Sequence, residues 1–138
     1  MNCVTNKVDV LSDLVCSQKI DILAVSETWL RPSVSSSFIS LLNYSAVRGD
    51  SDGGTDKHGV LLYINKLLKY EVITVNLPNV AAVHLIDLDV WVVAVYRPPR
   101  YSDFENTQLL NFISDFGFSK ELILLGDFNL HTYFKVVY

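Results

Sequence analysis

Three apolar segments of the chain end in polar residues whose oxygen atoms can bind a metal ion or contact a phosphate. These residues are Glu27, Tyr96, Asp127 and Asn129. A carboxylate directly after a buried strand is costly unless it meets water or a cation. Two carboxylates and a carboxamide at one edge of a sheet would form the hard, oxygen-rich kind of site that magnesium prefers. The pattern therefore predicts metal-assisted phosphate chemistry, provided that the fold brings these residues to the same edge.

Each of these residues also has a purely structural explanation. Glu27 could be a surface acid beyond a strand, and Asp127 with Asn129 could form a tight turn, because both side chains bond readily to their own main chain. Tyr96 precedes two prolines and could simply pack against a proline ring. Arg97 is a candidate for substrate binding through a phosphate, although solvated arginines are more common.

The elements that must position these residues follow from hydrophobic periodicity. Residues 7–18 have apolar side chains at helical spacing, with Asn6 as the expected N-cap. Residues 20–25 are apolar enough for a strand buried on both faces, and residues 66–75 fit a strand and a helical turn equally well. Further strands are predicted at 44–49, 59–65, 80–86, 90–96 and 121–125, and a second long helix at 104–116. The order of elements indicates one mixed α/β domain.

Composition excludes several classes of protein. The 138 residues suffice for one domain, and half of them are hydrophobic, which argues against disorder. The net charge of −4, without a basic run, excludes tight non-specific binding to nucleic acid unless a metal ion assists. Two cysteines give no disulfide framework. No segment is long enough to cross a membrane and no signal peptide is recognised, so an intracellular location, nuclear or cytoplasmic, is expected.

Four short motifs, in order, carry a family resemblance: "ETWL", "GVLLYI", "VYRPP" and "LLGDFNLH". Together they resemble the endonuclease/exonuclease/phosphatase superfamily. The Trp after "ET" and the double proline make the chain most similar to the endonuclease domain of non-LTR (LINE-type) retrotransposons. The resemblance implies a four-layer α/β/β/α sandwich and a Mg²⁺-dependent phosphodiesterase that nicks DNA.

The resemblance also implies a role for each site residue. Glu27 would be the magnesium ligand, and Asn2 would help to position both metal and phosphate. Tyr96 would donate its hydroxyl to the scissile phosphate. Asp127 would orient or deprotonate the attacking water, while Asn129 would hold the phosphate or the nucleophile in line. By contrast, no catalytic role is assigned to any of the histidines, which are His58, His84 and His131.

The pattern departs from the family after Asn129. The closing Asp-His motif of the superfamily is not found, so residues 1–131 are expected to be an incomplete domain and 132–138 an unrelated tail. A truncated sandwich should expose apolar strand faces and be inactive as a phosphodiesterase. Two alternatives stay open: a non-catalytic module that binds a protein partner or itself through the exposed sheet face, and an active phosphatase or phosphodiesterase of the same superfamily.

Overall fold

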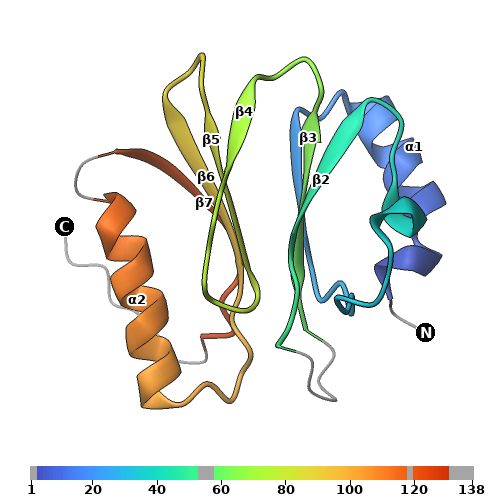
Figure 1. Cartoon of the computed structure of the whole chain (residues 1–138). Helices are drawn as coiled ribbons and strands as arrows, with labels where there is room; N and C mark the ends of the chain where they lie inside the picture. Colours follow the sequence, from blue (N-terminus) through green and yellow to red (C-terminus); the bar gives the residue numbers. More distant parts are fainter. Residues whose placement is uncertain (1–2, 53–57, 118–119, 131–138) are drawn as a thin grey trace.

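The chain folds into four layers, with two β-sheets packed between two outer helices (Figure 1). The computed structural model describes residues 3–52, 58–117 and 120–130. Helix α1 (Val8–Gln18) covers one sheet, and helix α2 (Asp103–Gly117) covers the other. This arrangement confirms the predicted four-layer α/β/β/α sandwich. None of the helices in these ranges is both long and apolar enough to span a membrane.

The first sheet has the strand order β1-β3-β2, and both of its pairings are antiparallel. Its strands are β1 (Ile22–Ser26), β2 (Tyr44–Gly49) and β3 (Val60–Asn65). Strand β3 is central, and its side chains alternate between two cores. Leu62 belongs to the core between the sheets, whereas Leu61 belongs to the core under α1. A strand covered on both faces must be apolar throughout, which explains the unbroken run "VLLYI".

The second sheet has the order β4-β5-β6-β7. Its strands are β4 (Tyr70–Ile73), β5 (Val80–Leu85), β6 (Val90–Tyr96) and β7 (Glu121–Asp127). Strands β4, β5 and β6 pair antiparallel, whereas β6 and β7 are parallel. A parallel pair needs a crossover connection, and α2 supplies it. The carboxyl ends of β6 and β7 therefore lie at the same edge of the sheet.

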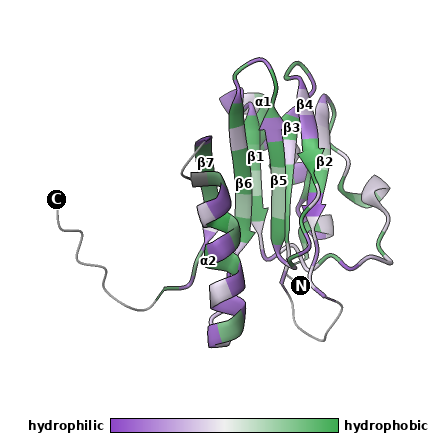
Figure 2. Cartoon of the chain, turned by 60° about the vertical axis from the view of Figure 1, so that its left-hand side comes forward, coloured by the Kyte–Doolittle hydropathy of each residue, from purple (hydrophilic) through white to green (hydrophobic). Residues whose placement is uncertain are grey.

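The core between the sheets is built from the inward side chains of β3, β5 and β6. Figure 2 shows β5 and β6 mostly in the hydrophobic colour, while α2 carries both hydrophobic and hydrophilic residues. On β6, Val92 faces the first sheet, and Val93 faces the helix α2 side. Both are almost completely buried. Burial on both faces holds β6 in a fixed register, and its last residue, Tyr96, is thereby placed at the sheet edge.

The start of α1 differs from the prediction. The N-cap is Lys7 rather than Asn6, and no side chain caps the helix. Asn6 instead ends a short 3₁₀ helix (Val4–Asn6), after which the carbonyl of Lys7 accepts the first hydrogen bond of α1, from the N–H of Leu11. A second 3₁₀ helix spans Ser36–Ile39. The preceding turn, which periodicity does not reveal, therefore shifted the cap by one residue.

One strand is less buried than predicted, and a second has exposed apolar side chains. Every residue of β1 is only partly buried, because β1 is an edge strand of the first sheet rather than an interior strand. In the described part of the chain β7 is also an edge strand, and its Ile123 and Leu124 are 45% and 37% exposed. The ambiguous segment 66–75 contains strand β4. Asn2 and the tail 132–138 lie outside the described residues.

Candidate active site

Three strand ends meet at one edge of the sandwich. Tyr96, the last residue of β6, is the register partner of Asp127, the last residue of β7. Glu27 follows the end of β1 in the opposite sheet. Because β6 and β7 are parallel, their final side chains are delivered to the same edge, where α/β sheets usually bind ligands. The fold thus brings Glu27 to Tyr96 and Asp127, which stand 69 and 100 positions further along the sequence.

A hydrogen bond joins the two sheets at this edge. The hydroxyl of Tyr96 donates to Oε1 of Glu27 at 2.9 Å. Tyr96 is 3% exposed, whereas Glu27 is exposed to solvent. Burial, the hydrogen bond to Glu27 and the charges of Glu27 and Asp127 raise the pKa of Tyr96 to about 12. The phenol therefore stays protonated at neutral pH and acts as a donor, with both carboxylates in electrostatic reach of it.

The segment after β7 is held in a compact turn. The main-chain N–H of Asn129 donates to Oδ1 of Asp127 at 3.0 Å, and Asn129 has a positive φ of 45°. Its side-chain amide donates to the carbonyl of Arg97 at 3.0 Å. The amide of Asn129 also lowers the pKa of Tyr96, in opposition to the two carboxylates. Asp127 and Asn129 therefore form the tight turn expected of these residue types, and this turn holds both side chains at the sheet edge.

Arg97 fixes this turn from the side of β6. Its main-chain N–H donates to the carbonyl of Asp127 at 2.8 Å. Its guanidinium donates to Oδ1 of Asn106 at 2.8 Å and to the carbonyls of Phe128 and Asn129 at 3.2 and 3.3 Å. A guanidinium that bonds three separate groups in this way orients the main chain around it. Contact between Arg97 and a phosphate stays a prediction.

The loop that carries Glu27 is pinned to the start of β3. The N–H of Thr28 donates to the carbonyl of Gly59, and that of Trp29 donates to the carbonyl of His58. Glu27 and Trp29 both have positive φ angles, of 53° and 56°. A Cβ on Gly59 would lie 2.5 Å from Oγ1 of Thr28, so only glycine permits this close approach. Because two strained residues flank buried Thr28, the Glu27 side chain has a defined direction.

His58, to which the sequence analysis assigns no catalytic role, lies beside the candidate site. The ring of His58 lies against the ring of Tyr96, with 5.3 Å between their centroids. Its position directly before Gly59 was the available signal, since the turn into β3 faces the end of β6. His84 instead makes hydrogen bonds with Glu71 and Asp89 on the surface. His131 lies outside the described residues.

The donor set of the site fits a hard divalent cation. Its oxygen atoms belong to Glu27, Asp127, Asn129 and Tyr96, and its edge is open to water at Glu27. Within the described ranges no three acidic, histidine or cysteine side chains cluster tightly enough to enclose a metal ion. An ion here would keep several water molecules or share phosphate oxygens, which is the usual behaviour of Mg²⁺.

Comparisons with known proteins bear on this arrangement. The chain is similar to the AP endonuclease from Archaeoglobus fulgidus, with a TM-score of 0.70, 16% identity and coverage of 94% of this chain and 55% of that one. A humanized D. rerio TDP2 gives a TM-score of 0.59, 14% identity and coverage of 94% and 57%. Truncated Caenorhabditis elegans TDP2 gives a TM-score of 0.53 and 13% identity, with coverage of 93% of this chain and 57% of that one. At such identities the likeness concerns the fold alone.

The chain spans little more than half the length of these solved structures. No curated protein has a significantly similar sequence. The model of the Endonuclease/Exonuclease/phosphatase family matches residues 3–134, which is nearly the whole chain and includes all four residues that converge at the sheet edge. The chain therefore belongs to the Endonuclease/Exonuclease/phosphatase family.

Proposed function

We propose that this chain binds a phosphodiester of DNA together with Mg²⁺ at the site formed by Glu27, Tyr96, Asp127 and Asn129. The observation that carries the proposal is the 2.9 Å hydrogen bond from Tyr96 to Glu27, because it joins the two sheets beside Asp127. A chain with a net charge of −4 has no general attraction for DNA, so binding depends on a cation held at this edge. The family and the AP endonuclease neighbour support a nucleic-acid substrate.

Each residue has a distinct part in the proposed chemistry. Glu27 holds the metal ion, and the protonated hydroxyl of Tyr96 donates a hydrogen bond to a phosphoryl oxygen. Asp127 accepts the proton of the attacking water, and Asn129 keeps the phosphate or the water in line. When bound, Mg²⁺ supplies Lewis-acid stabilisation of the negative charge that develops on the phosphate. The raised pKa of Tyr96 supports its role as a donor rather than a base.

Two further assignments belong to the same proposal. Arg97 contacts the substrate strand, in addition to holding the turn at Phe128 and Asn129. Asn2, which lies outside the described residues, contributes to both the metal and the phosphate site. The motifs "ETWL" and "VYRPP" support an origin in the endonuclease of a non-LTR retrotransposon.

We further propose that the 138-residue polypeptide binds its ligands without rapid hydrolysis. The chain covers 55% and 57% of two solved structures to which it is similar. The superfamily resemblance assigns transition-state stabilisation to an Asp-His motif, which Glu27, Tyr96, Asp127 and Asn129 do not supply. Donors aimed at the developing charge often supply much of the acceleration, so their loss would reduce turnover by roughly two to three orders of magnitude per donor.

Metal binding tests the site directly. We expect Mn²⁺, used as a paramagnetic substitute for Mg²⁺, to bind the chain and to promote binding of a fluorescein-labelled DNA duplex. Glu27→Gln should abolish both effects. Glu121→Gln is the matched control, because it makes the same charge change at the opposite end of β7. Equal Mn²⁺ binding by the two variants would refute the site.

Plasmid nicking tests the absence of turnover. We expect the chain with Mg²⁺ to relax supercoiled plasmid no faster than the Glu27→Ala or Asp127→Ala variant. Nicking that both substitutions abolish would contradict the inactive state and at the same time support the site. Hydrolysis of a phosphomonoester or a lipid phosphodiester, without nicking, would favour the alternative of an active phosphatase.

A second candidate function, a protein-interaction module, is favoured by one observation. Ile123 and Leu124 project from opposite faces of β7 and are both exposed, at the edge of the described second sheet. An apolar strand with an unpaired edge readily adds a strand from another chain. Light scattering with size-exclusion chromatography checks this: a stable monomer that does not bind an apolar dye would argue against such a module.

A further inference from the structure

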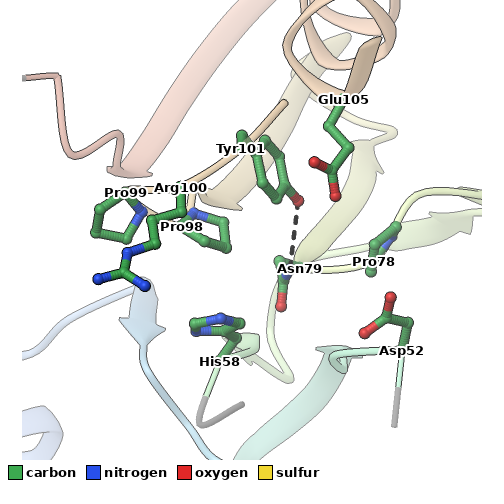
Figure 3. A pocket seen from close by; sticks show the side chains of 9 residues that line it. All are labelled: Asp52, His58, Pro78, Asn79, Pro98, Pro99, Arg100, Tyr101 and Glu105. Carbon is green, nitrogen blue, oxygen red and sulfur yellow. Dashed lines mark hydrogen bonds between the residues drawn. The ribbon is translucent and has the colours of Figure 1, made fainter. Parts of the chain in front are cut away.

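A hollow of about 460 Å³ lies next to the candidate active site (Figure 3). It is formed where the segment after β6 passes the start of β5 and the turn into β3. Its size is within the roughly 300–1,000 Å³ of pockets that bind small molecules. His58 lines the hollow, and its ring also lies beside that of Tyr96, with 5.3 Å between the ring centroids. A single ring therefore separates the hollow from the phosphate-binding group proposed above.

A buried amide points into this hollow without a partner for its oxygen. Asn79 is 3% exposed, and its Nδ2 donates to the hydroxyl of Tyr101 at 3.3 Å. Among the described residues nothing bonds its Oδ1, which is buried and which Figure 3 shows directed away from Tyr101. Leaving a buried acceptor unsatisfied is costly, so such a group calls for a donor from outside the chain.

The main chain explains why Asn79 keeps this position. Its N–H donates to the carbonyl of Asp50 at 3.1 Å, and its carbonyl accepts from the N–H of Tyr96 at 2.9 Å. It has a positive φ of 60°, which asparagine tolerates better than most residues. The amide is thus anchored by the same strand end that positions Tyr96. Turning the side chain outward to water would break its hydrogen bond to the hydroxyl of Tyr101.

The charged groups that line the hollow are two carboxylates and one guanidinium, which belongs to Arg100. Asp52 and Glu105 both line the hollow. The pKa of Tyr101 is raised mainly by the burial of Tyr101 itself, and the charges of Glu105 and Asp52 raise it further. Hydrogen bonds from the main chain and side chain of Ser102 lower the pKa of Glu105, which therefore stays ionised at neutral pH. With Arg100 counted, the acids are still in excess, which disfavours a phosphate in this hollow. A ligand that meets Oδ1 of Asn79 and the carboxylate of Asp52 must present hydrogen-bond donors to them.

Apolar and aromatic side chains also line the hollow. They include Pro98 and the rings of His58 and Tyr101 (Figure 3). Enzymes that act on nucleic acid hold single bases in this way, between aromatic or apolar side chains and with hydrogen bonds to one edge of the base. An acceptor-rich hollow would select bases that carry an exocyclic amino group.

We propose that this hollow binds an amino-bearing nucleobase, which is adenine, cytosine or guanine, of the nucleotide next to the phosphate held at Glu27 and Tyr96. The exocyclic amine donates to Oδ1 of Asn79 and to the carboxylate of Asp52, while the ring lies against His58 and Pro98. Thymine and uracil, which lack that amine, bind less well. The inference rests on the proposed function, because it takes the ligand to be part of a nucleic acid. Its test uses free nucleosides and does not depend on the metal site.

Nucleosides without any phosphate test the hollow independently of the metal site. Deoxyadenosine and purine deoxyriboside differ only in the exocyclic amine, so they form a matched pair. Both are titrated into the ¹⁵N-labelled chain without metal while its amide signals are followed by NMR. We expect deoxyadenosine to shift the side-chain amide of Asn79 and to bind about tenfold more tightly than the analogue, as a hydrogen bond to a charged acceptor would contribute.

Variants separate recognition from folding. Asp52→Asn changes an exposed side chain, so it should leave the fold intact and reduce the preference for deoxyadenosine severalfold. Asp13→Asn, an exposed acid on α1, is the control and should leave the preference unchanged. Tyr101→Phe removes the hydroxyl partner of the amide and should also weaken the preference. Equal affinity for both nucleosides in the unchanged chain would overturn the proposal.

Other outcomes are equally decisive. If MgCl₂ alone shifts the Asn79 amide and neither nucleoside does, the hollow is a cation site and the proposal is wrong. If nucleosides fail to bind but Mn²⁺ and DNA still bind in a Glu27-dependent manner, only the base site is refuted. If deoxyadenosine binds as expected while Mn²⁺ and DNA do not bind, the base site stands and the proposed function fails.

Discussion

Replacing Gly126 with alanine tests the geometry that places Asp127. Gly126 has a φ of 147°, and a Cβ there would lie 1.9 Å from the carbonyl oxygen of Val95, whereas ordinary contacts begin near 3.4 Å. Val95 is fully buried and paired with Gly126 in the β6–β7 ladder, so it cannot move aside. The strand end itself must retreat by about 1.5 Å. Because Asp127 comes next, its carboxylate moves away from Tyr96.

The expected loss of stability follows from this collision. A main chain held in a region that essentially only glycine populates costs roughly 1–3 kcal/mol for another residue. Opening the last hydrogen bond of the ladder adds roughly 0.5–1.5 kcal/mol. We expect Gly126→Ala to lower the free energy of unfolding by about 2–4 kcal/mol, and the melting temperature by about 8–16 °C for a chain of this size.

Leu125→Ala separates lost stability from lost geometry. Leu125 packs partly buried against the core between the sheets, so its truncation should cost about 2 kcal/mol or slightly more without moving the main chain. Mn²⁺ binding is then measured by electron paramagnetic resonance at a temperature where both variants are folded. We expect Leu125→Ala to bind Mn²⁺ normally and Gly126→Ala to bind it weakly. A Gly126→Ala chain that melts and binds like the unchanged chain would refute the close approach to Val95.

Three other substitutions have defined outcomes. Tyr96→Phe should change stability by only about 1 kcal/mol, because water replaces the hydroxyl at exposed Glu27, yet it should weaken Mn²⁺-dependent DNA binding severalfold in a fluorescence anisotropy titration. Arg97→Lys keeps the charge but loses the fork that holds the turn, so DNA binding should fall; unchanged affinity would show that charge alone matters. Hydrogen bonding to Glu71 raises the pKa of His84 above 6.5, so the stability it adds is complete below 6.5 and disappears as pH rises through the higher folded value. Glu71→Gln should therefore destabilise the chain in urea unfolding at about pH 6 and not at about pH 9.

The secondary structure was largely predictable where burial imposed a simple pattern. Strands β3 and β6 are covered on both faces, so their apolar runs left little ambiguity. The segment 66–75 was ambiguous because β4 is short and partly exposed, and its side chains satisfy two periods at once. The predicted N-cap of α1 was wrong by one residue, because Asn6 belongs to the 3₁₀ helix Val4–Asn6 and Lys7 caps α1 instead.

Some features of the candidate site were predictable from the sequence, and others were not. The polar groups at strand ends were visible in the sequence, since a carboxylate such as Glu27 is anomalous after an apolar run. The ring contact between His58 and Tyr96 was not visible in the sequence. The two residues are 38 positions apart, and the contact forms only when the two sheets pack. The fixed bonds of Arg97 to the turn were equally hidden, since they depend on the carbonyl directions of Phe128 and Asn129.

The sequence by itself determined which segments form strands and helices, and which residue types stand where those segments end, because both depend on local periodicity and on the cost of burying charge. Only the tertiary structure decided that Glu27 from one sheet meets Tyr96 and Asp127 from the other, since a hydrogen bond across two packed sheets depends on strand order and register. It likewise decided that Asn79 would be anchored beside this edge, where it lines a hollow. Local sequence does not predict these contacts, because they form only when the apolar faces of the two sheets pack against each other.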